Sequence, residues 1–167
     1  KLPDSREINA AVWHLGYINS YDLTKMTELL EISESKFDDL KYMGKLIEIL
    51  NKKEVDIGIA NSIESQIKIE NKTYRVWLGG NINPNLRSEL CNALCSKPFK
   101  DGTMPDFSAF WRYNPKSDEW WISLRGVPSR SPDLNDLASN FGGNGHLMAS
   151  GMTIKNSPEG LKKIFIY

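Results

Sequence analysis

Apolar side chains follow one spacing in the first part of the chain and a different spacing after it. Up to about residue 60, apolar residues recur at every third or fourth position, which predicts amphipathic helices. Three helices are predicted there, with starts at Asp4 or Ser5, at Asp22, and at Ser33 or Ser35. The apolar stripe of the third helix consists of Phe37, Leu40, Met43, Ile47 and Leu50.

From Ser65 onward, short runs of alternating apolar and polar residues predict β-strands. The predicted strands are 66–69, 74–78, 107–113, 119–124 and 164–167, and helices between or after them start near Pro84, Ser131 and Pro158. The first two strands are predicted to form a hairpin around Asn71-Lys72, and the next two to pair around residues 114–117. Strands and helices alternate without a strict β-α-β repeat. The predicted fold class is therefore α/β in the broad sense (α+β), a mixed β-sheet flanked by helices and preceded by a helical segment.

The charge balance, the hydropathy and the cysteines limit which ligands and partners we expect for the chain. Twenty-one basic residues balance twenty-one acidic ones, so no global field attracts polyanions, and nucleic-acid binding would need a local cluster of arginine and lysine. No apolar run is long enough to span a bilayer and no signal-peptide pattern occurs, so we expect a cytoplasmic protein without a membrane partner. Cys91 and Cys95 with two distant histidines show no metal-ligand spacing, which predicts no metal site in this chain.

The candidate chemistry lies in a glycine-rich stretch and in the arginine-bearing strand before it. Glycine lets a ligand approach the backbone closely, and a row of free amide N–H groups binds phosphate oxygens. The planar guanidinium of arginine binds phosphate with two parallel hydrogen bonds. We therefore predict that the amides near Gly143 and the guanidinium of Arg125 converge on one anion. The candidate phosphate-binding residues are Arg125, Arg130, Gly142, Gly143, Asn144, Gly145 and His146.

Each of these candidates also has a structural interpretation. A glycine cluster can be only a turn, His146 can cap the loop, and Arg125 can form a surface ion pair. Arg130 is the weakest candidate, because a loop arginine is equally well explained by solvation. Outward-facing aromatic residues between 107 and 121 could stack a nucleobase, but the sequence does not tell which of them face outward.

The order of these features resembles the C-terminal, DHH-associated domain of the Asp-His-His (DHH) superfamily of phosphoesterases. That domain has a strand ending in Ser-hydrophobic-Arg, a helix with Ala near its end, and a Gly-Gly-x-Gly-His loop followed by small residues and Gly. The matching segments here are Ser123-Leu124-Arg125, Leu137-Ala138, the stretch 142–146, and Ala149-Ser150-Gly151. The chain departs from this pattern at Asn144, where glycine is usual, and at Gly126, where a small hydroxyl residue is common.

The resemblance implies a division of labour within a longer enzyme. Residues 1–60 would be a helical connector from an N-terminal catalytic domain, and residues 61–167 would be the DHH-associated substrate-binding domain. The catalytic half would carry two Mn²⁺ ions, and the loop histidine, here His146, would face the scissile phosphate. The intact enzyme would act on short oligonucleotides, cyclic nucleotides or related phosphoesters.

The chain itself lacks the aspartate-rich motifs of the catalytic half, including Asp-His-His, and it opens at Lys1 without methionine. We therefore assign no catalytic residue, no metal ligand and no bound cofactor to this chain, and expect no hydrolysis by it alone. The expected partners are a phosphorylated substrate, such as a nucleotide or short oligonucleotide, and the N-terminal DHH domain, while a homodimer is left open. A stand-alone nucleotide- or RNA-binding module and a catalytically inactive structural relative remain as alternatives.

Overall fold

The computed structural model describes residues 33–69, 71–157 and 165–166. The two helices predicted within the first 32 residues and the helix predicted from Pro158 lie outside the described residues. The chain divides into two compact units, Lys1–Lys53 and Glu54–Tyr167. Helix α3 (Glu34–Ala60) crosses the boundary between them. The predicted start of the third helix at Ser33 or Ser35 is confirmed.

The last turns of α3, from Glu54 onward, belong to the core of the second unit. Val55 and Ile59 pack against its buried apolar residues, and the Glu54 carboxylate accepts a hydrogen bond from the backbone N–H of Asn83. These contacts explain why the helix extends to Ala60. Neither α3 nor any shorter helix in the described part of the chain combines the length and apolar character needed to cross a bilayer.

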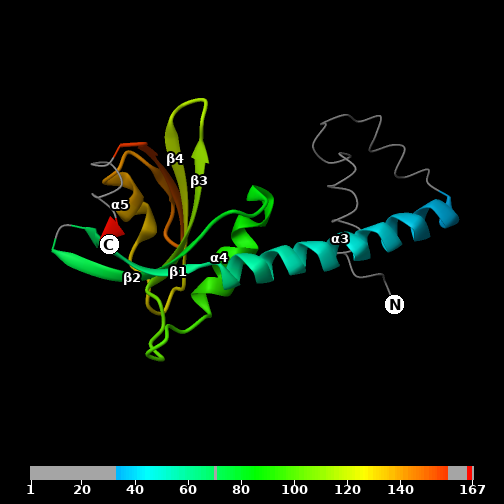
Figure 1. The fold of residues 1–167 in the computed structure, drawn as a ribbon, viewed down its shortest axis with the longest axis horizontal. Helices are drawn as coiled ribbons and strands as arrows, with labels where there is room; N and C mark the ends of the chain where they lie inside the picture. Colours follow the sequence, from blue (N-terminus) through cyan, green and yellow to red (C-terminus); the bar gives the residue numbers. More distant parts are fainter. Residues whose placement is uncertain (1–32, 70, 158–164, 167) are drawn as a thin grey trace. The chain divides into compact units, whose positions relative to one another are not determined.

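A mixed seven-stranded sheet forms the centre of the second unit, in the order β5-β6-β4-β3-β2-β1-β7. Strands β2 and β3 are parallel and every other neighbouring pair is antiparallel. The strands are β1 (Ile63–Ile69), β2 (Lys72–Gly79), β3 (Phe107–Asn114), β4 (Glu119–Gly126), β5 (Asn144–His146), β6 (Ala149–Lys155) and β7 (Phe165–Ile166) (Figure 1). The predicted α+β class and the predicted hairpins β1–β2 and β3–β4 are confirmed.

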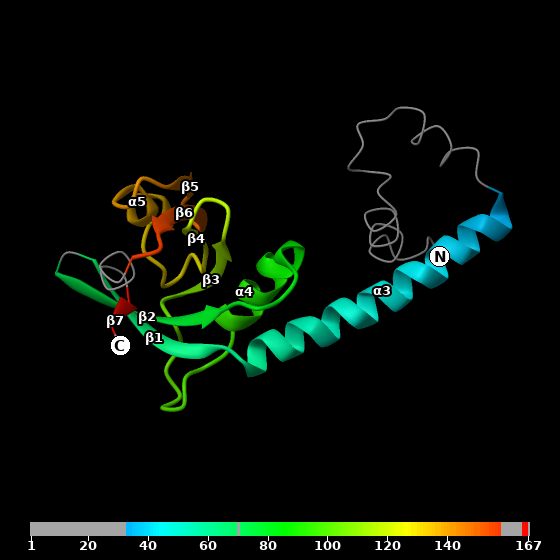
Figure 2. The same ribbon diagram turned by 45° about the horizontal axis from the view of Figure 1, so that its top comes forward.

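Helices cover both faces of this sheet. A short 3-10 turn, η1 (Pro84–Leu86), leads into α4 (Arg87–Cys95), and α5 (Leu134–Ser139) follows β4. Figure 2 shows α5 close to β5 and β6, and α4 close to β3. Two buried apolar clusters result, one that includes Leu124 and Met152 with α5, and one that includes Phe110 with α4. Because side chains alternate along a strand, the neighbours of Leu124 on β4 point to the opposite face, where α4 lies.

Candidate functional site

The first part of the glycine-rich stretch ends helix α5. Gly142 has φ +73°, the left-handed conformation that glycine adopts without a Cβ clash. Its N–H donates to the Ser139 carbonyl at 3.0 Å, and the N–H of Gly143 donates to the Ala138 carbonyl at 2.9 Å. These two bonds form a Schellman motif, a common way for a helix to satisfy its last carbonyls. Gly142 is therefore required by the end of the helix.

Gly143 and Gly145 allow strand β5 to lie very close to β6. A Cβ on Gly143 would lie 2.7 Å from the Met152 Cβ and still closer to the Gly151 carbonyl oxygen. A Cβ on Gly145 would lie 2.5 Å from the Ala149 carbonyl oxygen. The motif predicted as a phosphate-binding loop thus includes the edge strand β5, whose backbone approach to β6 excludes larger residues.

Three amides of this stretch already have acceptors within the protein. Besides those of Gly142 and Gly143, the N–H of Gly145 donates to the Asn135 side-chain oxygen at 2.9 Å. The predicted row of free N–H donors is therefore wrong at these three glycines. These donors are satisfied by oxygen atoms of α5, which lie close to the glycines in the chain. The acceptors are main-chain carbonyls for Gly142 and Gly143 and the Asn135 side chain for Gly145.

Arg125 lies near the end of β4, on the face of the sheet that α4 covers in part. One terminal nitrogen (Nη1) donates to the Leu124 carbonyl at 2.9 Å, and the other (Nη2) donates to the Ser88 hydroxyl at 3.1 Å. No carboxylate of the described residues forms an ion pair with it. A guanidinium has five N–H donors, and two of those of Arg125 donate to described residues.

The strand register places Arg125 and His146 in one row. Arg125 lies directly opposite Ala149 across the β4–β6 pair, and Ala149 lies directly opposite His146 across the β6–β5 pair. Residues opposite each other in antiparallel strands project to the same face. Two strand spacings, about 9–10 Å, therefore separate the arginine and histidine backbones. The His146 side chain is exposed and Arg125 is half-buried, and the register places both residues on the same side of the sheet.

Small or polar residues form the next row on the same face. Ser123 is opposite Gly151, and Gly151 is opposite Asn144. The intervening Ser150 projects to the other face, where its hydroxyl donates to the Leu134 carbonyl at 2.5 Å. We call the side of β4, β6 and β5 that bears these two rows the open face. Its members are Ser123, Arg125, Asn144, His146, Ala149 and Gly151.

Arg130 has a structural role in the described chain. Its Nε donates to the Pro105 carbonyl at 2.7 Å, and its Nη2 donates to the Cys95 carbonyl. The arginine thereby connects the loop after β4 to the last residue of α4 and to Pro105, which precedes β3. The structure brings Arg125, Asn144 and His146 to the open face and directs the Arg130 guanidinium to these two carbonyls.

Two further residues belong to this neighbourhood and were not assigned from the sequence. Ser88 contacts Arg125 from 37 positions away, and no motif marks that serine. Trp121 lies on the same face of β4 as Ser123 and Arg125, and its side chain is 48% exposed. Alternation from Arg125 along the predicted strand could have found Trp121, whereas only the packing of α4 places Ser88.

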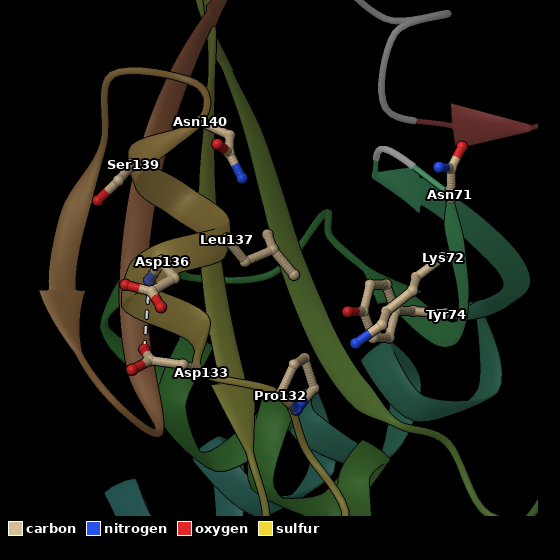
Figure 3. Close-up of a pocket in the computed structure, with 9 residues that line it drawn as sticks. All are labelled: Asn71, Lys72, Tyr74, Pro132, Asp133, Asp136, Leu137, Ser139 and Asn140. Atoms are coloured by element: carbon tan, nitrogen blue, oxygen red, sulfur yellow. Dashed lines mark hydrogen bonds between the residues drawn. The ribbon is translucent and has the colours of Figure 1, made fainter.

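The described residues also line two hollows, and the lining of the second includes Arg112, which lies opposite Trp121. One of about 620 Å³ lies between α5 and β2, where Lys72 and Tyr74 project toward Leu137 (Figure 3). The Asp133 carboxylate, which lines this hollow, caps α5 by accepting from the N–H groups of Asn135 and Asp136. The other, of about 390 Å³, is lined in part by the aromatic residues Phe110, Trp111, Tyr113 and Trp120.

The two cysteines are buried in the interface between α4 and the sheet. Burial raises the pKa of the Cys91 thiol to about 12, so the thiol remains protonated near neutral pH. The Cys95 sulfur lies 3.3 Å from the Ser108 hydroxyl. Within the described ranges, no three His, Cys, Asp or Glu side chains gather as a metal-binding group.

Comparison with known proteins finds similarity to parts of longer proteins. No family model matches the chain. Over 71 residues it is 39% identical to an uncharacterized protein of Acanthamoeba polyphaga mimivirus, an alignment that covers 42% of this chain and only 15% of the viral protein. Among solved structures it is similar to a pGpG-specific phosphodiesterase, PggH, from Vibrio. The TM-score is 0.44 at 15% identity, covering 82% of this chain and 42% of that one.

Proposed function

We propose that residues 61–167 are the substrate-binding domain of a DHH-type, metal-dependent phosphoesterase, and that Arg125 and His146 hold the phosphate of its substrate. The catalytic Mn²⁺ ions would be bound by another domain of the whole protein. The substrates in this proposal are nucleotides, short oligonucleotides or related phosphoesters. The domain's part is to bind and orient the phosphate, while the chemistry takes place on the metal-bearing side.

One observation carries the proposal: the register places Arg125, Ala149 and His146 in a single row on the open face. The Ser88 hydroxyl and the Leu124 carbonyl hold the guanidinium in place, which lowers the entropy lost when it binds an anion. Ala149, between the two polar residues, has a small side chain. The motif residues that resemble the DHH-associated domain lie in β4, β5 and β6, in α5, and in the turn between α5 and β5.

The amides of the glycine-rich stretch have a revised part in this proposal. Because those of Gly142, Gly143 and Gly145 donate within the protein, the side chains of Arg125 and His146 supply the main phosphate contacts. The glycines contribute indirectly, since they allow β5 to pack where His146 meets Ala149.

The test is an NMR titration of the ¹⁵N-labelled chain with ribose 5-phosphate. We expect chemical-shift changes on β4, β5 and β6. Arg125→Ala should weaken binding about 10- to 100-fold, because a hydrogen bond to a charged group contributes about 1.5–3 kcal/mol. His146→Ala should weaken binding in the same direction.

Arg112→Ala is the matched control. Arg112 is exposed and lies on β3, directly opposite Trp121. Trp121 is four residues, or about 13 Å, from Arg125 along β4. Its removal changes the net charge as Arg125→Ala does but should leave the affinity nearly unchanged. If both arginine variants weaken binding equally, the anion is attracted by general charge and the assigned site is wrong. If Arg125→Ala binds like the wild type, the proposal fails outright.

A further inference from the structure

The open face continues beyond the arginine–histidine row, and its next large side chain is an exposed indole. Residues 121, 123 and 125 project to the same side of β4, so Trp121 follows Ser123 on the open face. Trp121 is 48% exposed, whereas Trp77, on the part of this face covered by α4, is 5% exposed. An aromatic ring at this position presents its face to whatever binds beside the anion row.

The residues between the indole and the anion row are small. On β6, Gly151 lies opposite Ser123, and Thr153 lies opposite Trp121. A Cβ added to Gly151 would meet nothing nearer than the Ile122 carbonyl oxygen at 3.4 Å, an ordinary contact distance. The surface above Gly151 is therefore open enough to accept a Cβ. The result is a low strip of small residues, with an arginine and a histidine at one end and a tryptophan at the other.

The length of the strip suits a ligand with its anionic group at one end. The backbones of Trp121 and Arg125 are about 13 Å apart along β4, and the small residues Ser123 and Gly151 lie between their rows. A ligand with an anionic group, a compact polar middle and a flat aromatic end fits this arrangement.

We infer that Trp121 stacks on a nucleobase of the substrate, so that the ligand is a nucleotide or short oligonucleotide rather than a sugar phosphate or polyphosphate. The inference rests on the proposed function, because the phosphate at Arg125 and His146 sets the position of the base. Stacking uses the ring face that all bases share, so it tolerates different bases. Recognition is then selective for nucleotides and weakly selective for sequence.

The test compares two ligands that differ only in the base, adenosine 5′-monophosphate and ribose 5-phosphate, on the full 167-residue chain. The wild type should bind the nucleotide about 5- to 150-fold more tightly, the range that stacking of one base supplies. Trp121→Leu should bring the nucleotide close to the affinity of ribose 5-phosphate and leave ribose 5-phosphate itself unchanged. Trp121→Phe, which keeps an aromatic ring, should retain most of the nucleotide preference.

Two further variants separate stacking from structural effects. Gly151→Val places a branched side chain in the strip and should weaken nucleotide binding while the unfolding midpoint stays near that of the wild type. Trp120→Phe changes the neighbouring indole, which faces the other side of the sheet against Trp111 at a ring-centroid distance of 4.7 Å. That variant should bind both ligands as the wild type does.

The outcomes distinguish this inference from the proposed function. If Arg125→Ala loses both ligands while Trp121→Leu loses neither, phosphate binding stands and the stacking assignment is overturned. Equal binding of the two ligands by the wild type also overturns it, and would indicate that another surface covers Trp121. If neither ligand binds the wild type at millimolar concentration, or if Arg125→Ala binds both unchanged, the proposed function and the inference fail together.

Discussion

Adding one methyl group at successive glycines tests the structural explanation of the glycine-rich stretch. The perturbations are Gly143→Ala, Gly142→Ala and Gly151→Ala. At Gly143 the new Cβ would lie 2.7 Å from the Met152 Cβ and closer still to a backbone oxygen, so β5 must move. Overpacking of this kind costs about 1–3 kcal/mol, and a clash with backbone belongs at the upper end.

The other two substitutions should destabilise the fold less, because the added Cβ meets no close atom. At Gly142 nothing lies within 4 Å of the added Cβ, and the cost is that of holding alanine at φ +73°, about 1–2 kcal/mol. At Gly151 the nearest atom is 3.4 Å away, so the change in a β-strand should be within about 0.5 kcal/mol or slightly stabilising. The expected order of destabilisation is Gly143, then Gly142, then Gly151.

Urea unfolding followed by far-ultraviolet circular dichroism gives the free energy of unfolding for each variant. Hydrogen exchange at the amides of β5 and β6 locates the damage, which Gly143→Ala should concentrate in these two strands. The reasoning is refuted if Gly143→Ala is as stable as the wild type, or if Gly142→Ala is the more destabilising. Either result would mean that β5 does not pack on β6 as closely as described.

The remaining predictions concern buried and paired polar groups. Arg130→Ala should lower the free energy of unfolding by about 1–3 kcal/mol, because it leaves two backbone carbonyls without their hydrogen-bond donor. The variant should bind ribose 5-phosphate with unchanged affinity. A loss of affinity in the folded variant would mean that Arg130 belongs to the binding site. The pKa of Cys91 rises from 9.0 to about 12 in the folded chain, so stability should fall as the pH rises from about 9 to 12, and Cys91→Ala should flatten that slope in urea titrations. Hydrogen bonds from Thr103, and then from Arg75, lower the pKa of Asp101 from 3.8 to about 2. The stability contributed by this carboxylate is therefore present above pH 4 and lost as the pH falls toward 2. An Asp101→Asn variant should lose part of this pH dependence. If its unfolding midpoint changes between pH 4 and pH 2 as much as that of the wild type, the assignment is contradicted.

Local patterns were sufficient to predict most of the described elements. Alternation around Asn71-Lys72 and around residues 114–117 predicted the two hairpins, and Pro84 marked the start of the helical segment that includes α4. These signals arise within a few residues, where strand alternation and turn chemistry act directly. The prediction for 142–146 was less complete, because a glycine needed for close backbone packing looks the same in sequence as a glycine that admits a ligand.

By itself, the sequence determined the alternation that directs Arg125 and Trp121 to one face of their strand, and the order of motif residues that resembles a phosphoesterase domain. Only the tertiary structure decided that His146 shares a row with Arg125, that Ser88 holds the guanidinium, and that the glycine amides are already occupied. The reason is physical. Which side of a strand a residue faces follows from its immediate neighbours, whereas register and helix packing depend on contacts between segments far apart in the chain.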